Sequence, residues 1–438
     1  MANQAMKVGS FTPTQTEPVL YAMAGDDCSL HHDLDQLTSK QQIDHAENQM
    51  LTAALQLALM GIGKPGDQVA LVDQFQQADW QSLLRHYHAM FDAIGLAPVQ
   101  LNGVRYVSQE RYYQQVAELG AVARLLNLYM VSGSNEVLHR SEHALSVSRD
   151  VNSKLHFARN APQAGIPVPE THIYTRAQII QGNADAFFAE NPGGVMLKIL
   201  GLAGARNVVA VANREECEAY IAEFDESLEV LLQKKLDTAR YTEMTVDLTL
   251  TEDSVTINNV RKILFADGKW VGNYFGPDNE LSPAHRQVLL TVGEYARKQG
   301  HVELEGTNCG IDYFVDGDEV IVTEINARWT GGLFPAEFLR QLSYDGPAIA
   351  FFDTVPVAER DRLVEFQHAA MHDANAEQPF SLVSMGFSPF SLGEPGEEFF
   401  ICWQLVLGDF RAFVCARDAQ LSEQCFPTAT AIAREMPD

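Results

Sequence analysis

The sequence predicts a chain that combines an α/β layer with α+β regions. In the first 150 residues or so, short apolar strands alternate with helical stretches, which is typical of a parallel sheet covered by helices. From residue 241, apolar segments follow one another with only short turns between them, which indicates an antiparallel meander. A further hairpin is predicted over 310–328, where apolar and polar residues alternate on both sides of a DGDE turn.

The predicted elements of the N-terminal region follow in order. Residues 1 to about 40 are turn-rich and show no clear periodicity. Residues 44–60 carry apolar side chains at helical spacing, and the KPGD segment at 64–67 ends that helix. We then expect a buried strand at 69–73, a helix over 81–94, a strand near 99–104, a helix near 110–126 and a strand at 128–131. Residues 1–150 are therefore predicted to form one α/β domain.

A change of character follows the GIPVP segment at 165–169, whose prolines favour an extended connector. A strand over 194–199 leads into a loop of small residues. The meander strands are expected at 241–251, 254–265 and 269–275, with a helix over 283–299. A second hairpin is predicted from 399–407 and 410–416, with its turn at 408–409. These elements suggest domains at 151–355, with a lid at about 170–236, and a small α+β extension at 356–438.

Composition excludes several classes of function. The formal net charge is −27, from 58 acidic and 31 basic residues, so nucleic acid and anionic membranes are disfavoured partners and a nucleotide would need a local positive island. The six cysteines form no CxxC pair, which argues against a zinc cluster or a disulfide framework. No signal peptide or membrane-spanning segment is visible, so a reducing cytoplasm is the expected location.

The hairpin at 310–328 contains a candidate metal site. Folding it at its turn places Asp312 and Glu324 opposite each other, with Cβ atoms about 5 Å apart. The two-residue period of a strand then puts Glu324, Asn326 and Arg328 on one face. Two opposed carboxylates repel each other, so we expect a cation between them. The side chains of Asp, Glu and Asn offer oxygen ligands, which suit Mg²⁺ better than zinc or copper. The alternative is a solvated hairpin face with incidental acids.

Four upstream features are compatible with a nucleotide. Lys198 ends a strand and is followed by a loop with Gly201 and Gly204, where backbone amides can approach phosphate oxygens, although the spacing is not that of a Walker loop. The LLQKKLD segment at 231–237 offers a polar strand edge to an adenine ring, Glu243 can accept ribose hydroxyls, and Lys154 precedes the GIPVP connector. Each feature alone is more commonly a turn or a solvated side chain.

In this order the features resemble the ATP-grasp superfamily, over roughly residues 150–345. The closest resemblance is to its amino-acid and peptide ligase branch, in which a strand of the form found at 324–328 (EINAR) leads into a Gly-Gly loop, here at 331–332. The resemblance implies an N-terminal Rossmann-like, pre-ATP-grasp domain and antiparallel sheets that flank a nucleotide cleft.

The resemblance also implies roles for individual residues. It assigns phosphate binding to Lys154, Lys198 and the loop with Gly201 and Gly204, adenine binding to Gln233, Lys234 and Leu236, ribose binding to Glu243, metal binding to Asp312, Glu324 and Asn326, and catalytic roles to Arg328 and Lys198. The implied cofactors are ATP and two Mg²⁺ ions, with Mn²⁺ as an alternative. Two departures stand out: Gln233 replaces the usual glutamate, and the loop after Lys198 has fewer glycines than in most relatives.

The function expected from this resemblance is an ADP-forming carboxylate–amine ligase that activates an amino acid or similar acid as an acyl phosphate. The expected partners are a small carboxylate and an amine, with a homodimer as a further expectation. Alternatives are a carboxylase-type or nucleotide-pathway ligase, and a regulator that binds Mg-ATP without chemistry. Among the other candidates, His31 and His32 are expected in a solvated loop. Trp329 and Phe334 are expected to pack in the core, and the alternative is that they line an acceptor pocket.

Overall fold

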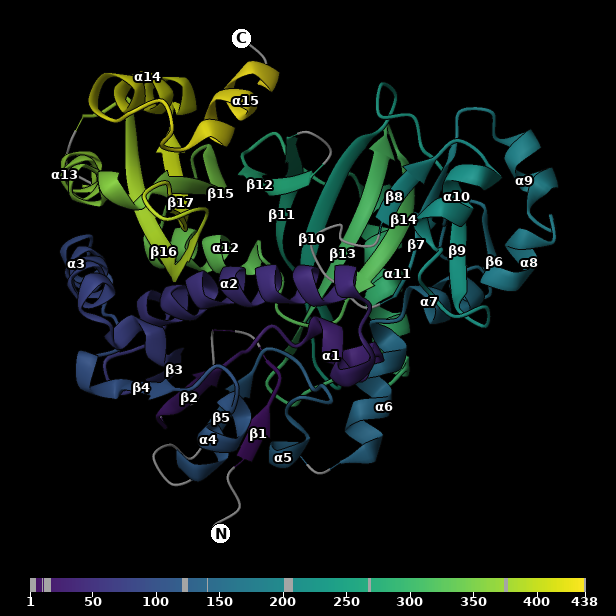
Figure 1. Cartoon of the computed structure of the whole chain (residues 1–438), viewed down its shortest axis with the longest axis horizontal. Coiled ribbons are helices and arrows are strands. Elements are labelled where there is room, and N and C mark those ends of the chain that lie inside the picture. The colour runs from purple at the N-terminus through teal and green to yellow at the C-terminus, as the bar shows by residue number, and fades with distance from the viewer. Residues whose placement is uncertain are drawn as a thin grey trace.

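The computed structural model describes residues 5–9, 11, 17–119, 125–139, 141–200, 208–266, 269–373 and 377–436. Three β-sheets and the helices between them make up this part of the chain (Figure 1). None of its helices is both long enough and apolar enough to cross a membrane. The combination of one parallel sheet with antiparallel sheets confirms the predicted fold class.

The N-terminal sheet is parallel throughout, as predicted. Its five strands have the order β1-β5-β2-β3-β4. The strands are β1 (Ala5–Lys7), β2 (Val19–Ala22), β3 (Gln68–Val72), β4 (Val104–Val107) and β5 (Leu125–Leu128). The helices of this region are α1 (Asp27–His31), α2 (Ser39–Ile62), α3 (Ala78–Ala93), α4 (Tyr112–Leu119), α5 (Glu136–His139) and α6 (Glu142–Val151).

Two predictions for this region are wrong in position. The strand expected near 99–104 lies at Val104–Val107, because Leu101–Gly103 forms a short 3₁₀ turn. The strand expected at 128–131 lies at Leu125–Leu128. The segment before residue 40 also contains β2 and α1, which the sequence did not indicate. The four residues of β2 are all buried, and such a short apolar strand shows no period.

The central sheet has eight antiparallel strands in the order β14-β13-β10-β11-β12-β15-β17-β16. They are β10 (Thr242–Leu250), β11 (Val255–Ala266), β12 (Lys269–Phe275), β13 (Thr307–Asp316), β14 (Glu319–Asn326), β15 (Ala348–Pro356), β16 (Phe380–Leu392) and β17 (Phe399–Gly408). The predicted meander is confirmed, and so is the helix at 283–299, which is α11 (Pro283–Lys298). The meander turn at 267–268 lies outside the described residues.

A smaller antiparallel sheet lies to one side, at the right of Figure 1, with the order β6-β9-β7-β8. It contains β6 (Thr171–Thr175), β7 (Val195–Lys198), β8 (Val208–Val211) and β9 (Glu229–Lys234), together with α8 (Arg176–Ile180), α9 (Asp185–Glu190) and α10 (Arg214–Tyr220). These elements have their own hydrophobic core. They fall within the range predicted as a lid, and the loop with Gly201 and Gly204 lies outside the described residues.

The second hairpin predicted near the C-terminus is wrong in its second arm. Residues after Gly408 form helix α14 (Phe410–Gln420), and β17 pairs instead with β16 and β15. The Asp409 side chain accepts hydrogen bonds from the amides of Arg411 and Ala412, which caps the helix. The remaining helices are α7 (Lys154–Asn160), α12 (Leu333–Gln341), α13 (Arg360–Ala370) and α15 (Pro427–Glu435). The predicted domain boundaries stay predictions.

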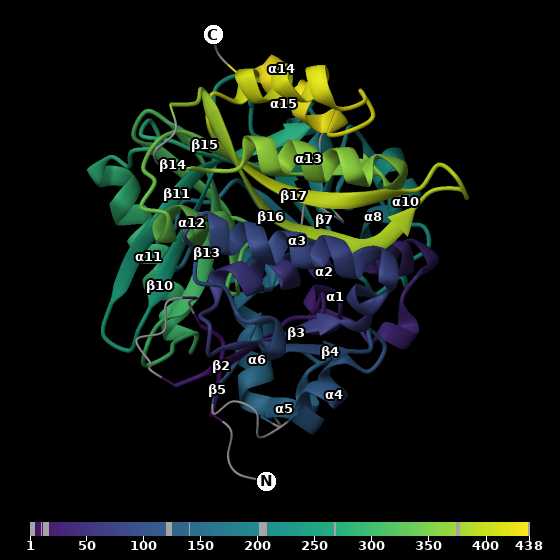
Figure 2. The same cartoon turned by 90° about the vertical axis from the view of Figure 1, so that its left-hand side faces the viewer.

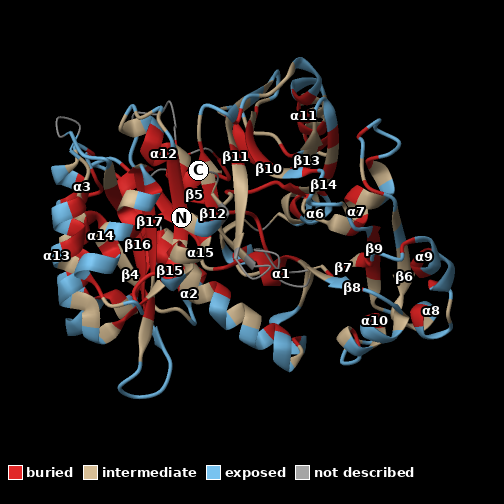
Figure 3. Cartoon of the chain, turned by 90° about the horizontal axis from the view of Figure 1, so that it is seen from above, coloured by how far each residue is buried: buried red, intermediate tan, exposed pale blue. Residues whose placement is uncertain are grey.

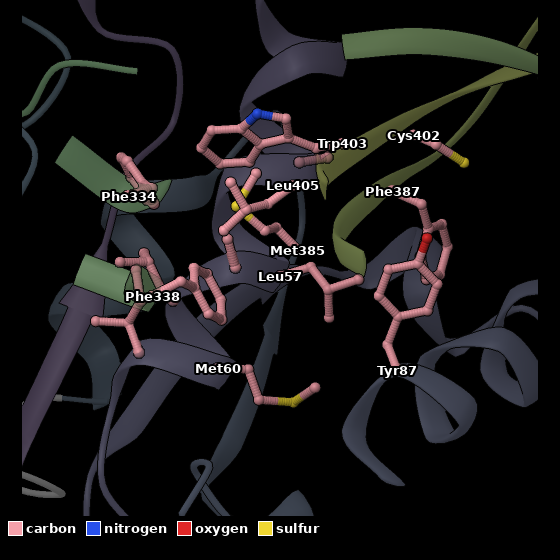
Figure 4. Close-up of a cluster of buried hydrophobic side chains, with 14 of the residues drawn as sticks. Leu57, Met60, Tyr87, Phe334, Phe338, Met385, Phe387, Cys402, Trp403 and Leu405 are labelled. Atoms are coloured by element: carbon pink, nitrogen blue, oxygen red, sulfur yellow. The ribbon is translucent and has the colours of Figure 1, made fainter. Parts of the chain in front are cut away.

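Helix α2 lies between the parallel sheet and the C-terminal strands β16 and β17 (Figures 1 and 2). It begins with a capping box, in which the side chains of Thr38 and Gln41 each accept a hydrogen bond from the other residue's amide. Most of its residues from Thr52 to Ile62 are buried, whereas much of its N-terminal part is exposed (Figure 3). Its apolar side chains join one large core with β16, β17, α3 and α12 (Figure 4). Trp329 and Phe334 are fully buried in this core, as predicted.

Candidate functional site

The two acids of the predicted hairpin are directly opposite each other. Asp312 on β13 pairs with Glu324 on β14, which confirms the predicted register. The side-chain amide of Asn326 donates a hydrogen bond of 2.9 Å to Asp312. Both acids are partly buried, and a register shift follows Asp312 in the ladder. Two carboxylates and an amide thus lie together at the end of one hairpin.

A lysine from a distant segment neutralises one of these acids. Lys154 is the first residue of α7. The preceding residue, Ser153, caps this helix, because its hydroxyl accepts a hydrogen bond from the amide of His156. The Lys154 ammonium lies 2.5 Å from a carboxylate oxygen of Glu324, and the two side chains are only 10% and 20% exposed. The predicted phosphate-binding lysine is therefore brought to the predicted metal ligand.

Lys198 and Glu243 belong to the same electrostatic cluster. Burial lowers the pKa of Lys198 to about 8, although the charges of Glu324, Asp312 and Glu243 act in the opposite direction. Burial and the charge of Asp312 raise the pKa of Glu243 to about 7. Lys198 ends β7 of the small sheet and Glu243 is the second residue of β10 in the central one, so the cluster joins two sheets. The predicted roles in phosphate and ribose binding stay predictions.

The two opposed acids are not equivalent. Burial and the charge of Glu324 raise the pKa of Asp312. Burial also acts to raise the pKa of Glu324, but Lys154 and Lys198 outweigh it and the net shift is downward. Opposed carboxylates in a partly buried site favour a bound cation, and the donors present are carboxylate and amide oxygens. Asp312, Glu324 and Asn326 therefore fit a Mg²⁺ ion.

Arg328 is held from the N-terminal region, which the sequence did not indicate. Its Nε donates a hydrogen bond of 2.8 Å to Asp27 of α1. The Tyr129 hydroxyl donates to both oxygens of the same carboxylate at 3.0 Å, and the guanidinium lies 5.8 Å from the centre of the Tyr129 ring. Asp27 and Tyr129 follow strands of the parallel sheet, so this sheet orients the predicted catalytic arginine.

A buried ion pair supports the backbone around Arg328. Arg261 lies 2.7 Å from Asp247, and both side chains are almost completely buried. Asn308 links the pair to the site, because its amide donates to Asp247 at 3.1 Å and to the backbone carbonyl of Arg328 at 2.8 Å. A Cβ atom at Gly332 would lie 1.8 Å from Nε of Arg261, so the predicted Gly-Gly loop packs directly on this arginine. The alternation of polar residues along β10, which includes Asp247, was the sequence signal that could have indicated this buried ion pair.

The predicted adenine-binding segment lies at the end of β9. The Gln233 side chain is buried and donates a hydrogen bond of 3.0 Å to the hydroxyl of Thr171. The backbone amide of Lys234 donates to the carbonyl of Glu170 at 2.8 Å. Leu236 follows the strand and is half-buried. The assignment of adenine to Gln233, Lys234 and Leu236 stays a prediction.

A pocket brings four of the predicted residues, Lys154, Glu324, Asn326 and Arg328, together with others that the sequence did not assign to the site. Its lining residues lie in α1, just after β5, between α6 and α7, at the start of α7, just after β7, and in or just after β14, and they are Asp27, Leu30, His31, Met130, Asn152, Lys154, Leu200, Glu324, Asn326 and Arg328. The expectation that His31 and His32 form a solvated loop is wrong. His31 ends α1 and lines the pocket, and Nε2 of His32 lies 2.9 Å from the carbonyl oxygen of Leu200. Tertiary packing decides this placement, which local polarity could not indicate.

No family model matches the sequence, and no curated protein matches it either. Solved structures do match over most of its length. Biotin carboxylase from Campylobacter jejuni, in complex with β-γ-ATP, is 12% identical, with a TM-score of 0.54 over 92% of this chain and 91% of that one. The biotin carboxylase domain dimer of the 2-oxoglutarate carboxylase of Hydrogenobacter thermophilus, with MgADP, ADP and bicarbonate, is 12% identical, with a TM-score of 0.53 over 93% and 90%.

A third similar structure is N5-carboxyaminoimidazole synthase from Aspergillus clavatus, in complex with ADP and an aminoimidazole ribonucleotide. It is 14% identical, with a TM-score of 0.51 over 92% of this chain and 96% of that one. At such identities the likeness shows the fold. The fold extends over nearly the whole chain, including the parallel sheet before residue 150 and the strands after residue 356.

Proposed function

We propose that this chain, which has the ATP-grasp fold, is an ADP-forming ligase that activates a carboxylic acid as an acyl phosphate and transfers the acyl group to an amine. The observation that carries the proposal is the pairing of Asp312 with Glu324 in a cluster that also contains Lys154, Lys198 and Arg328. Phosphoryl transfer depends on positioning and on neutralising charge, and this cluster offers both.

The polar residues divide the work of binding a Mg–nucleotide. Asp312, Glu324 and Asn326 would hold Mg²⁺, which when bound supplies neutralisation of charge on the transferred phosphoryl group. Lys154 and Lys198 would contact phosphate oxygens. An arriving polyanion stabilises the charged form of Lys198, whose pKa burial holds at about 8. Gln233, Lys234, Leu236 and Glu243 are the proposed contacts of the nucleoside.

The proposed reaction has two steps that balance without a further reactant. A carboxylate oxygen attacks the γ-phosphorus and ADP leaves, which forms the acyl phosphate. The amine nitrogen then attacks the carbonyl carbon, the bond to the phosphate oxygen breaks, and phosphate leaves with the proton that nitrogen loses. Arg328 carries the planar, charged group suited to a carboxylate or an acyl phosphate. Its fixed contact with Asp27 means that it need not be ordered during the reaction.

An organic acid such as an amino acid is the finer form of the proposal. The pocket is lined by Leu30, Met130 and Leu200 as well as by charged groups, which suits substrates with carbon skeletons. The alternative is a carboxylase-type or nucleotide-pathway ligase, with bicarbonate as the acid. The structural similarity to biotin carboxylase and N5-carboxyaminoimidazole synthase supports this alternative. A regulator that binds Mg-ATP without chemistry is a third reading.

Hydroxylamine trapping tests the proposal. The protein is incubated with Mg²⁺, ATP and hydroxylamine together with single acids, including the common amino acids and bicarbonate, and both hydroxamate and ADP are measured. We expect an amino acid or a related acid to give both products. ADP release with bicarbonate alone would favour the carboxylase reading. Tight Mg-ATP binding with no ADP from any acid would favour the regulator.

A further inference from the structure

One wall of the pocket is not assigned to either of the two substrates in the function proposed so far. It consists of Asp27, Leu30 and His31 from α1 together with Met130, which follows β5. This wall belongs to the N-terminal region, whereas the acids Glu324 and Asn326 belong to β14 of the central sheet. The pocket therefore lies between the proposed metal ligands and a separate surface of mixed polarity.

His31 presents an unused hydrogen-bond acceptor in this wall. Its Nε2 is buried and has no hydrogen-bond partner among the residues that the structure describes, whereas the ring donates to the backbone carbonyl of Asn152. The proton thus belongs on Nδ1, and Nε2 carries a lone pair. Burial, the neighbouring His32, and the cations Lys154 and Arg149 lower the pKa of His31 to about 4, so the ring is neutral near pH 7.

Asn152, the partner of His31, is itself hydrogen-bonded to the segment that follows β14. The side chain of Asn152 accepts a hydrogen bond of 2.8 Å from the amide of Ala327 and donates to its carbonyl at 3.3 Å. Ala327 lies between the proposed ligand Asn326 and the catalytic Arg328. The orientation of the His31 ring is therefore coupled to the position of these two residues.

The chemistry of the wall selects between the two substrates. A neutral Nε2 accepts a hydrogen bond, so it suits an N–H group and repels a carboxylate, which has no hydrogen to donate at neutral pH. The carboxylate of Asp27 likewise suits a donor. The side chains of Leu30 and Met130 are almost completely buried and offer apolar surface beside these acceptors. An unpaired buried acceptor is costly, so binding of a donor here is favourable.

We propose that this wall is the subsite for the amine substrate, in which His31 Nε2 accepts a hydrogen bond from the attacking nitrogen and Leu30 and Met130 contact an apolar group. The substrate class is a primary amine that bears an apolar side chain. His31 directs the nitrogen lone pair toward the acyl carbon. The proposal rests on the ligase function and adds the identity of the acceptor subsite.

Kinetics with two amines test this subsite. Leucine amide and glycine amide serve as acceptors with whichever acid gives a hydroxamate. We expect leucine amide to be the better acceptor. His31→Ala should raise the KM for leucine amide about tenfold relative to the KM for the acid, the effect of one lost hydrogen bond. His31→Gln, whose amide oxygen can accept, should restore the KM to within about threefold.

His143→Ala is the matched control, because His143 is exposed on the neighbouring helix α6. Thermal unfolding of each variant identifies any loss of fold. A rise in the KM for the acid equal to that for the amine in His31→Ala would overturn the subsite and leave the ligase function intact. So would an unchanged amine KM. A wild-type protein that makes no hydroxamate from any acid would overturn both proposals.

Discussion

Replacement of Glu324 by Gln separates the electrostatics of the site from the stability of the fold. The substitution keeps the size of the side chain and removes its charge. In the native chain this charge lies 2.5 Å from the Lys154 ammonium and directly across the ladder from Asp312. The variant therefore loses one attraction and one repulsion at the same point.

The two effects on stability partly cancel. Breaking a fully buried ion pair costs about 3–5 kcal/mol. The Lys154 and Glu324 side chains are 10% and 20% exposed, so water screens part of this interaction, and relief of the repulsion from Asp312 offsets more of it. We expect a net loss of less than about 2 kcal/mol. Activity should respond more strongly, with turnover reduced at least about 10²-fold, because a contact made in the transition state is lost.

The assay is steady-state ADP release at saturating Mg²⁺ and ATP, with the unfolding temperature measured on the same sample. Glu319→Gln is the control, since Glu319 lies on the same strand and its side chain, 46% exposed, pairs with Arg240 at the surface. We expect this variant to keep wild-type turnover. Turnover of the Glu324 variant within about threefold of wild type, in a folded protein, would remove Glu324 from the metal site and refute the reasoning.

Three further predictions concern other parts of the chain. Gly386→Ala should lower the free energy of unfolding by about 1–3 kcal/mol, because the added Cβ would lie 2.2 Å from the carbonyl oxygen of Ala54. Denaturant unfolding measures this change. Gly66→Ala is the control and should have little effect, because no atom lies within 4 Å of its added Cβ. Burial raises the pKa of Asp353 from 3.8 to about 7, so the folded state binds the extra proton and wild-type stability should fall as pH rises from about 4 to about 7. Asp353→Asn should flatten that slope, and an unchanged slope would contradict the assignment. Removal of Mg²⁺ with EDTA should abolish ADP release, and excess Mg²⁺ should restore it; activity that persists in EDTA would exclude a metal role.

The hairpin of the site could be predicted because its determinants are local. The turn at 316–319 and the alternation on both sides of it fix the register within one segment of chain. The contact between Arg328 and Asp27 joins residues separated by 301 positions, and no local pattern encodes it. The place of His31 was misjudged for the same reason, since a polar segment gives no sign of the surface that will cover it.

The error after residue 408 has a different cause. The segment 410–416 is apolar enough to resemble a strand, yet its buried residues Phe410, Phe413, Val414 and Arg417 recur at helical spacing. Asp409 favours the helix over the strand, because its side chain accepts hydrogen bonds from two backbone amides at the start of the helix. In a strand, such amides would donate to a neighbouring strand instead. Recognition of Asp409 as a helix N-cap would have corrected the prediction.

The C-terminal residues, which carry no chemical motif, gain a role from their packing. Strands β15, β17 and β16 continue the sheet that contains Asp312 and Glu324, and β16 packs against α2 closely enough that only glycine fits at position 386. Helix α2 starts eight residues after His31, and the Thr38 cap fixes that start. The C-terminal strands thus hold α2 against the sheet, and through α2 they restrain the segment that carries Asp27 and His31. This coupling predicts that a loosened contact at Gly386 weakens amine binding as well as the fold, although none of the described residues beyond 356 lines the pocket.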